Sequence, residues 1–156
     1  SAGRHLHGRD DHATRDLDAA MTTRTASVDA TRALGARVAA AACAGDCYAL
    51  EGELGAGKTE FVRGFVAALS PAAAVKSPSF SICNIYETEK FPVYHFDFYR
   101  LSGAAELGET GFDEYASGGG VCLVEWGTKF PEVLPPHTKV IRFRDAGGGV
   151  REIDLP

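Results

Sequence analysis

The sequence predicts an α/β domain in which helices flank a mostly parallel sheet. Apolar segments with helical and with strand periodicity alternate along the chain, and a glycine-rich loop joins one strand to a helix. The 156 residues suffice for one domain, and 45% of them are apolar, which is enough for a core. No apolar run reaches the about 18 residues of a membrane-spanning helix, so we expect no membrane association and a cytoplasmic location.

The N-terminal segment differs in composition from the rest of the chain. Residues 1–26 are mostly Arg, Asp, His, Thr and Ala, with almost no large apolar side chains. Such a segment buries too little apolar surface to offset the conformational entropy that it loses on ordering. We therefore expect a loosely ordered tail over residues 1–26 and a folded domain over residues 27–156.

Two helices are expected in the first half of the domain. The first spans about residues 28–44, with Ser27 as its N-cap and Gly45 at its C-terminal end. The second spans residues 58–69, where large apolar side chains recur every four residues and Pro71 follows the end. Weak helical turns are expected within residues 104–115.

Strands are expected where short apolar runs lie between turn residues. The second and third of these runs, and also the last two, are separated by short polar links and are expected to form antiparallel hairpins. In chain order, the expected strands are residues 47–51, 79–86, 93–98, 121–124, 139–144 and 150–155.

Residues 52–59 read GELGAGKT, which matches the Walker A pattern Gly-x-x-x-x-Gly-Lys-Thr. Glycines let the backbone curl so that successive N–H groups point at phosphate oxygens, and the following helix adds the positive end of its dipole. Lys58 adds a compact charge near the β- and γ-phosphates, and the Thr59 hydroxyl is a suitable ligand for Mg²⁺. The pattern predicts that the loop binds ATP with Mg²⁺. The expected nucleotide contacts are Glu53, Leu54, Gly55, Ala56, Gly57, Lys58, Thr59 and Glu60.

Two carboxylates, Asp97 and Glu125, each follow an apolar run. At the carboxyl edge of a parallel sheet such groups hold Mg²⁺ or position the attacking water. For either residue the alternative is a charge that only marks the end of a strand, and the nearby glycine-rich loop favours the functional interpretation. Thr59 and one carboxylate would bind the metal, and the other would orient or deprotonate water. Glutamate reaches farther, which favours Glu125 as the base. Lys58, Asp97 and Glu125 are therefore the candidate catalytic residues.

Three other residues leave alternatives open. Ser79, in Lys-Ser-Pro-Ser, could sense the γ-phosphate or the metal as part of a switch loop, or could belong to a plain proline turn. His95 could carry a proton, although a histidine that simply packs in a strand is the more common case. Trp126, the only tryptophan, could stack on a substrate, although packing is more common for this residue type.

Charge and cysteine content limit the possible partners. There are 16 basic and 21 acidic side chains, a net charge of −5, which does not favour unaided binding to a nucleic acid. The four cysteines lack the spacing of a zinc site, so we interpret them as reduced, mostly buried thiols.

Four motifs, in this order and spacing, resemble the TsaE family, the bacterial ATPase of tRNA threonylcarbamoyladenosine synthesis: GELGAGKTEFVRGF, KSPSF, YHFDFYRL and CLVEW. The resemblance covers about residues 28–155. It implies a P-loop NTPase-type three-layer sandwich. It also implies ATP hydrolysis that is weak in the isolated protein and stimulated by TsaD-like and TsaB-like partners. With them the family supports modification of adenosine 37 in tRNA, and tRNA would be contacted only through the complex.

The resemblance also implies roles for single residues. Phosphate binding falls to Gly55, Gly57, Lys58 and Thr59, metal binding to Thr59 and Glu125, and a catalytic role to Asp97. Thr31 matches a family position near the nucleotide. Ser79 stands where the family usually has threonine, and serine keeps the hydroxyl that a switch role requires.

The same residues also bear on three other functions. A small-molecule kinase needs a substrate pocket and usually an arginine-bearing lid, for which the short link after Leu69 and the arginine-poor middle of the chain leave little room. A GTPase would need an Asn-Lys-x-Asp segment, which does not occur. A nucleotide-gated binding module without significant turnover is the third possibility, and Asp97 and Glu125 argue against it only modestly.

Overall fold

The computed structural model describes residues 21–53, 55–71, 75 and 82–156. Leu54 and Ser79, both expected at the nucleotide, lie outside the described residues, as does most of the expected tail. Among the described helices, none has the length and apolar character that crossing a membrane requires.

Seven strands form one sheet in the order β1-β7-β6-β2-β5-β4-β3. The four central strands, β6, β2, β5 and β4, are parallel, whereas β3, β7 and β1 join at the two edges in antiparallel pairs. The mostly parallel sheet and both hairpins are as predicted. The strands are β1 (Met21–Thr25), β2 (Cys47–Glu51), β3 (Cys83–Tyr86), β4 (Val93–Asp97), β5 (Val121–Glu125), β6 (Lys139–Gly147) and β7 (Val150–Leu155).

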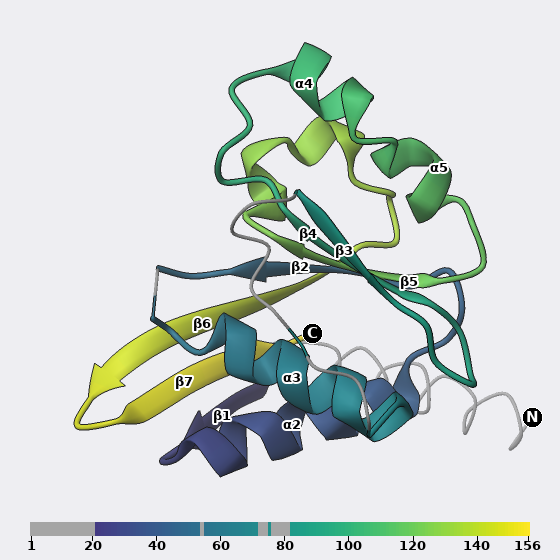
Figure 1. The fold of residues 1–156 in the computed structure, drawn as a ribbon. Coiled ribbons are helices and arrows are strands. Elements are labelled where there is room, and N and C mark those ends of the chain that lie inside the picture. Colours follow the sequence, from purple (N-terminus) through teal and green to yellow (C-terminus); the bar gives the residue numbers. More distant parts are fainter. Residues whose placement is uncertain (1–20, 54, 72–74, 76–81) are drawn as a thin grey trace, which may run out of the picture.

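Helices cover both faces of the sheet (Figure 1), which gives the predicted three-layer sandwich. Alternate side chains of β2 and β5 enter opposite cores: Leu50 and Leu123 face one core, Cys47 and Val124 the other. The first core lies under the long helices and the second under the short ones. The helices are α2 (Val28–Ala41), α3 (Lys58–Leu69), α4 (Ala104–Glu109) and α5 (Phe112–Ala116), with single turns at Gly127–Lys129 and Pro131–Val133.

The first helix begins where predicted and ends earlier. The Ser27 hydroxyl accepts a hydrogen bond from the backbone N–H of Ala30, as an N-cap does. The helix ends at Ala41 because Ala42 adopts an extended conformation, three residues before the predicted glycine. Gly45 has a φ of +94° in the turn that leads into β2.

The predicted N-terminal tail is wrong for its last residues, because Met21–Thr25 form strand β1. This strand pairs in continuous register with residues 151–155 of β7. The composition of residues 1–26 indicated too few apolar side chains, but an edge strand is held mainly by backbone hydrogen bonds, and β-branched threonine suits a strand. Thr25 is buried, and its hydroxyl lies 2.7 Å from that of Thr31.

The cysteines are free thiols, as expected. Cys47 and Cys122 are buried on neighbouring strands and Cys83 is half-buried, whereas Cys43 is exposed.

Two glycines let α2 and α3 pack in unusually close contact. A Cβ atom at Gly64 would lie 1.8 Å from the carbonyl oxygen of Arg32, and one at Gly35 would lie 2.1 Å from that of Phe61. Both obstructing atoms belong to the backbone and cannot swing aside. The close contact holds the start of α2 next to the start of α3, where the glycine-rich loop ends.

We expect Gly64→Ala to destabilise the fold by about 3 kcal/mol, because the new methyl group must push the two helices apart. Thermal and urea denaturation measure the loss. Gly108→Ala in α4 is the matched control. No atom lies within 4 Å of a Cβ there, so alanine should be neutral or slightly stabilising. Equal stability of the two variants would contradict the close packing.

Candidate functional site

The Gly52–Thr59 loop leaves the carboxyl end of β2 and enters α3, which is the strand-loop-helix order that the motif requires. Gly52, Gly55 and Gly57 have φ angles of +150°, +81° and +106°. Other residues rarely adopt such angles, so each glycine of the motif is needed for the path of the backbone. Gly57 is the N-cap of α3, and Lys58 is its first residue.

A cavity of about 240 Å³ lies beside this loop. It brings together most of the residues that the sequence singled out: Thr31, Gly55, Gly57, Lys58, Thr59, Glu60, Asp97, Glu125 and Trp126. Glu53 and Ala56 belong to the loop but do not line the cavity, and Ala56 is buried. Five further lining residues were not expected at the site from the sequence: Ser27, Val28, Tyr99, Gly149 and Arg151.

The two carboxylates meet because β4 and β5 are parallel neighbours. Asp97 and Glu125 are direct partners in the register, and Glu125 is also aligned with Leu50 of β2. The strands therefore deliver both carboxylates to the edge at which the loop begins. Burial raises the pKa of Asp97, and a 2.9 Å hydrogen bond from the backbone N–H of Tyr99 partly opposes that shift.

His95 holds Glu125 in place. It is fully buried in β4, and its Nε2 lies 2.6 Å from Oε2 of Glu125. Its Nδ1 is buried and has no hydrogen-bond partner among the described residues. Because a carboxylate oxygen accepts, Nε2 carries the hydrogen of this bond and donates it to Glu125. The sequence suggested either a packing histidine or a proton carrier; the structure shows a strand histidine that orients the carboxylate.

Lys58 is 4% exposed and points back over its own loop. Its ammonium group donates to the carbonyl oxygen of Gly52 and lies 4.5 Å from the centre of the Trp126 ring. Burial lowers the pKa of Lys58, and the carboxylates of Glu125, Asp97 and Glu51 oppose this shift. The buried cation is thus compensated by a carbonyl group, an aromatic face and nearby acids.

Trp126 is the only described non-glycine residue with positive φ, at 59°. This conformation costs a side chain about 1–2 kcal/mol. The backbone N–H of Trp126 donates to the carbonyl of Leu50, and its ring lies 5.1 Å from that of Tyr99. The strained turn turns the ring toward Lys58, so Trp126 belongs to the wall of the cavity as well as to the packing.

Glu51 is a third acidic residue at this edge of the sheet, beyond the two carboxylates expected from the sequence. One carboxylate oxygen accepts from the backbone N–H and the hydroxyl of Thr128, and the other is buried without a hydrogen-bond partner among the described residues. Its position at the end of β2, directly before Gly52, could have predicted from the sequence that Glu51 lies beside the loop.

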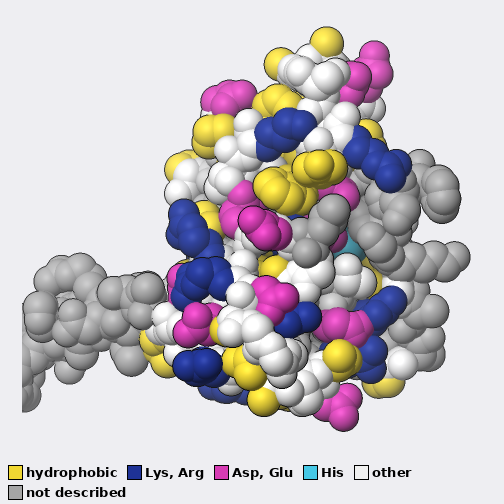
Figure 2. Space-filling view, turned by 90° about the vertical axis from the view of Figure 1, so that its left-hand side faces the viewer, with side chains coloured by type: hydrophobic (Ala, Val, Ile, Leu, Met, Phe, Trp, Pro, Cys, Tyr) yellow, Lys and Arg dark blue, Asp and Glu magenta, His cyan; other side chains and the backbone are white. Residues whose placement is uncertain are grey.

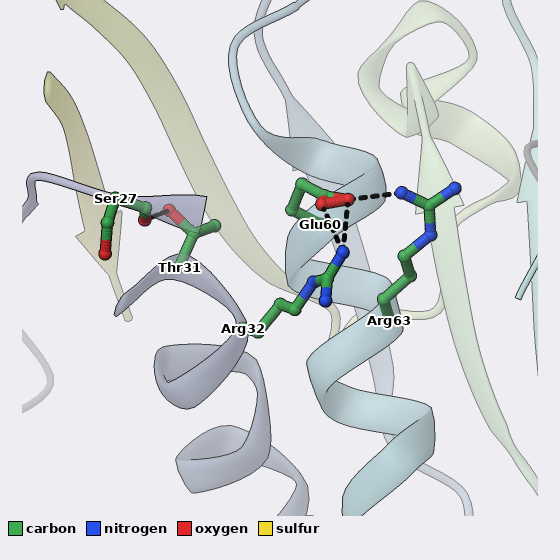
Figure 3. Close-up of polar contacts among 5 residues, drawn as sticks. All are labelled: Ser27, Thr31, Arg32, Glu60 and Arg63. Atoms are coloured by element: carbon green, nitrogen blue, oxygen red, sulfur yellow. Dashed lines mark hydrogen bonds and ion pairs between the residues drawn. The ribbon is translucent and has the colours of Figure 1, made fainter. Parts of the chain in front are cut away.

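Glu60 lines the cavity, but its carboxylate is already paired with two arginines. Its carboxylate accepts a 3.1 Å hydrogen bond from Arg32 of α2 and a further one from Arg63 of α3 (Figure 3). Burial alone would raise the pKa of Glu60, but the two arginines outweigh it and lower the pKa. Through this carboxylate, α3 is tied to the first turns of α2, from which Ser27 and Thr31 reach the cavity.

The residues fit a magnesium ion held together with phosphates. A Thr59 hydroxyl and two carboxylates line the same cavity, and hard oxygen ligands of this kind suit Mg²⁺. The part of the chain that the structure describes contains no group of three His, Cys, Asp or Glu side chains placed to hold a metal alone. Mg²⁺ usually needs only one or two protein ligands, since phosphates and water complete its shell.

Comparison with known proteins identifies the family. The sequence model described as "Threonylcarbamoyl adenosine biosynthesis protein TsaE" matches residues 25–153. The chain belongs to the TsaE family. The resemblance that the four motifs predicted is therefore confirmed, and the match begins at the last residue of β1.

Relatives of the TsaE family support the same conclusion. The Bacillus subtilis (strain 168) "tRNA threonylcarbamoyladenosine biosynthesis protein TsaE" is 43% identical over 130 residues, which are 83% of this chain and 81% of that protein. The Treponema pallidum (strain Nichols) protein of the same name is 36% identical over 111 residues, 71% of this chain and 82% of that protein. A crystal structure of Bacillus subtilis YdiB matches with a TM-score of 0.72 and 38% identity, covering 87% of this chain and 84% of that one. The P-loop-type fold is thus confirmed.

The ion pairs of Glu60 predict a stability that depends on pH. The pKa of Glu60 in the folded protein lies below its usual value of 4.5. The ion pairs therefore stabilise the fold fully at pH values above 4.5, and this stabilisation is lost as the pH falls through the lower pKa of the folded state. We expect Glu60→Gln to cost about 1 kcal/mol at pH 7, since both arginines are partly exposed. Urea denaturation at pH 7 and pH 4 measures the difference, which should shrink at the lower pH. A difference that stays constant would contradict this role.

Proposed function

We propose that this chain is the ATP-hydrolysing subunit that supports threonylcarbamoyl modification of adenosine 37 in tRNA, together with TsaB-like and TsaD-like partners. The single observation that carries the ATPase part is that Lys58, Thr59, Asp97 and Glu125 line one cavity beside the Gly52–Thr59 loop. Membership in the TsaE family carries the tRNA part.

The loop would hold the phosphates. Its glycines leave backbone N–H groups free to face them, and the N-terminal end of α3 favours negative charge. Lys58, now bonded to the Gly52 carbonyl and lying over Trp126, would turn its charge to the β- and γ-phosphates. Mg²⁺, when bound, neutralises the developing charge on the phosphate oxygens. Thr59 and Glu125 are the residues that would hold it.

The two carboxylates have different surroundings, which favours a division of labour. His95 forms a hydrogen bond to one oxygen of Glu125 and so fixes the orientation of this carboxylate, which a metal ligand requires. Asp97 is bonded only to a backbone N–H among the interactions described, and burial raises its pKa toward that of a useful base. Asp97 would therefore orient or deprotonate the attacking water. The reach of glutamate alone had favoured the opposite assignment.

The charges on one face support a role in which partners hold the tRNA. Figure 2 shows the face on which the β6–β7 hairpin ends, and there the acidic and basic side chains of the described residues are intermixed. Together with the net charge of −5, this favours tRNA contact through TsaB-like and TsaD-like proteins in the cytoplasm.

Binding and hydrolysis are separable by mutation. We expect Lys58→Ala to weaken Mg-ATP binding by about 10–100-fold, the loss typical of a charged hydrogen bond. Asp97→Asn and Glu125→Gln should retain most of the binding but lose hydrolysis by about 100-fold or more. Isothermal titration calorimetry and phosphate release measure the two effects, and Lys90→Ala, on the distant β3–β4 link, is the control.

Normal hydrolysis in both carboxylate variants would refute the mechanism. A nucleotide-gated binding module would bind Mg-ATP in a Lys58-dependent way without measurable phosphate release. A kinase would form ADP and a phosphorylated acceptor, without free phosphate, and only when an acceptor is added.

The biological role has its own test. Depletion of the protein in cells should reduce threonylcarbamoyladenosine in tRNA, measured by mass spectrometry of nucleosides. The wild-type gene should restore the modification, and Lys58→Ala should not. Unchanged tRNA modification after depletion would refute the role in tRNA even if the ATPase activity stands.

A further inference from the structure

Arg151, in the last strand, lines the same cavity as Lys58 and is not explained by the roles given above. We propose that Arg151 is a nucleotide-binding residue: its guanidinium group leaves Asp145 to bind the phosphate chain of the nucleotide. This inference rests on the proposed binding of a nucleotide at the Gly52–Thr59 loop.

The stem of Arg151 already lies against the loop. A Cβ atom at Gly57 would lie 3.6 Å from Cγ and 3.7 Å from Cδ of Arg151, and 3.6 Å from the methyl group of Thr31. Arginine and threonine thus enclose the loop on the side of α2, at Gly57, the N-cap of α3. A phosphate cradled by the loop N–H groups would lie within reach of the guanidinium.

The backbone that carries Arg151 is fixed from both sides. Arg151 pairs with Thr25 of β1 and with Asp145 of β6 in the sheet register. Gly149, two residues earlier, also lines the cavity and has a φ of +82°. The hairpin therefore presents the arginine to the loop from a rigid strand. Such placement lowers the entropy lost when the side chain binds a ligand.

The present partner of Arg151 is weakly held. A single contact of 3.2 Å joins its Nη1 to Asp145, whose side chain is 60% exposed. By contrast, Arg144 on the same hairpin makes two contacts to Asp154, at 2.6 and 3.0 Å. An exposed pair with one contact contributes little, so a phosphate can replace the carboxylate. Asp145 also accepts from the backbone N–H of Gly147 and keeps a partner when the arginine leaves.

The charges that line the cavity favour a second cation, besides Lys58, at the phosphates. Its lining contains the carboxylates of Glu60, Asp97 and Glu125, and the cations that face them there are Lys58 and Arg151. Glu60 is already paired with Arg32 and Arg63. A triphosphate carries several negative charges, and guanidinium binds phosphate in a two-pronged geometry that an ammonium group cannot provide.

The test is nucleotide affinity of purified variants of the full chain, measured by calorimetry with ADP and with Mg-ATP. Arg151→Ala should bind both about 10-fold or more weakly, and Arg151→Lys should lose less, because it keeps the charge. Arg144→Ala is the matched control, from the same hairpin and also paired with an aspartate, and should bind as wild type does. Asp145→Asn should bind at least as tightly as wild type, because the competing carboxylate is gone.

Wild-type affinity in Arg151→Ala would overturn the inference. So would a loss in Asp145→Asn as large as that in Arg151→Ala, because it would show that the ion pair acts by holding the hairpin. Lys58→Ala, measured in parallel, separates the two levels of argument. If Lys58→Ala loses binding and Arg151→Ala does not, only the inference about Arg151 fails. If neither variant loses binding, the proposed nucleotide site itself fails.

Discussion

The candidate site depends on one constraint, the parallel pairing of β2, β5 and β4. In that register Leu50, Glu125 and Asp97 lie at the same edge of the sheet, and the Gly52–Thr59 loop begins two residues after Leu50. A shift of one residue in either pairing would turn a carboxylate to the opposite face. The site is therefore as well defined as the core that fixes this register.

Burial gives the site its chemical character. Lys58, His95 and Glu125 are all buried, and each has a polar or aromatic partner within the site. In such surroundings charges interact more strongly than in water, and leaving one unpaired is costly. The polar groups thus hold one another in fixed directions before any ligand arrives. The strained turn at Trp126 is part of this arrangement, because it places the ring against Lys58.

The sequence predicted the local features well, because they depend on nearby residues. The bounds of α3, the N-cap of α2 and the glycine loop follow from residue types within a few positions. The contacts between distant segments could not be read from the sequence in this way. His95 and Glu125 are 30 residues apart, and β1 is a strand only because β7 offers it a free edge. The position of Arg151 could not be predicted, because it lies beside the loop only through the return of the β6–β7 hairpin.

Under the proposed function, this edge of the sheet hydrolyses ATP within a tRNA-modifying assembly. Phosphate release from Mg-ATP by the purified chain, with and without TsaB-like and TsaD-like proteins from the same organism, tests it most directly. We expect slow release by the chain alone and clear stimulation by the two partners together. We also expect the stimulation to be lost in Glu125→Gln. Release that the partners leave unchanged, or stimulation that persists in this variant, would contradict the proposed function.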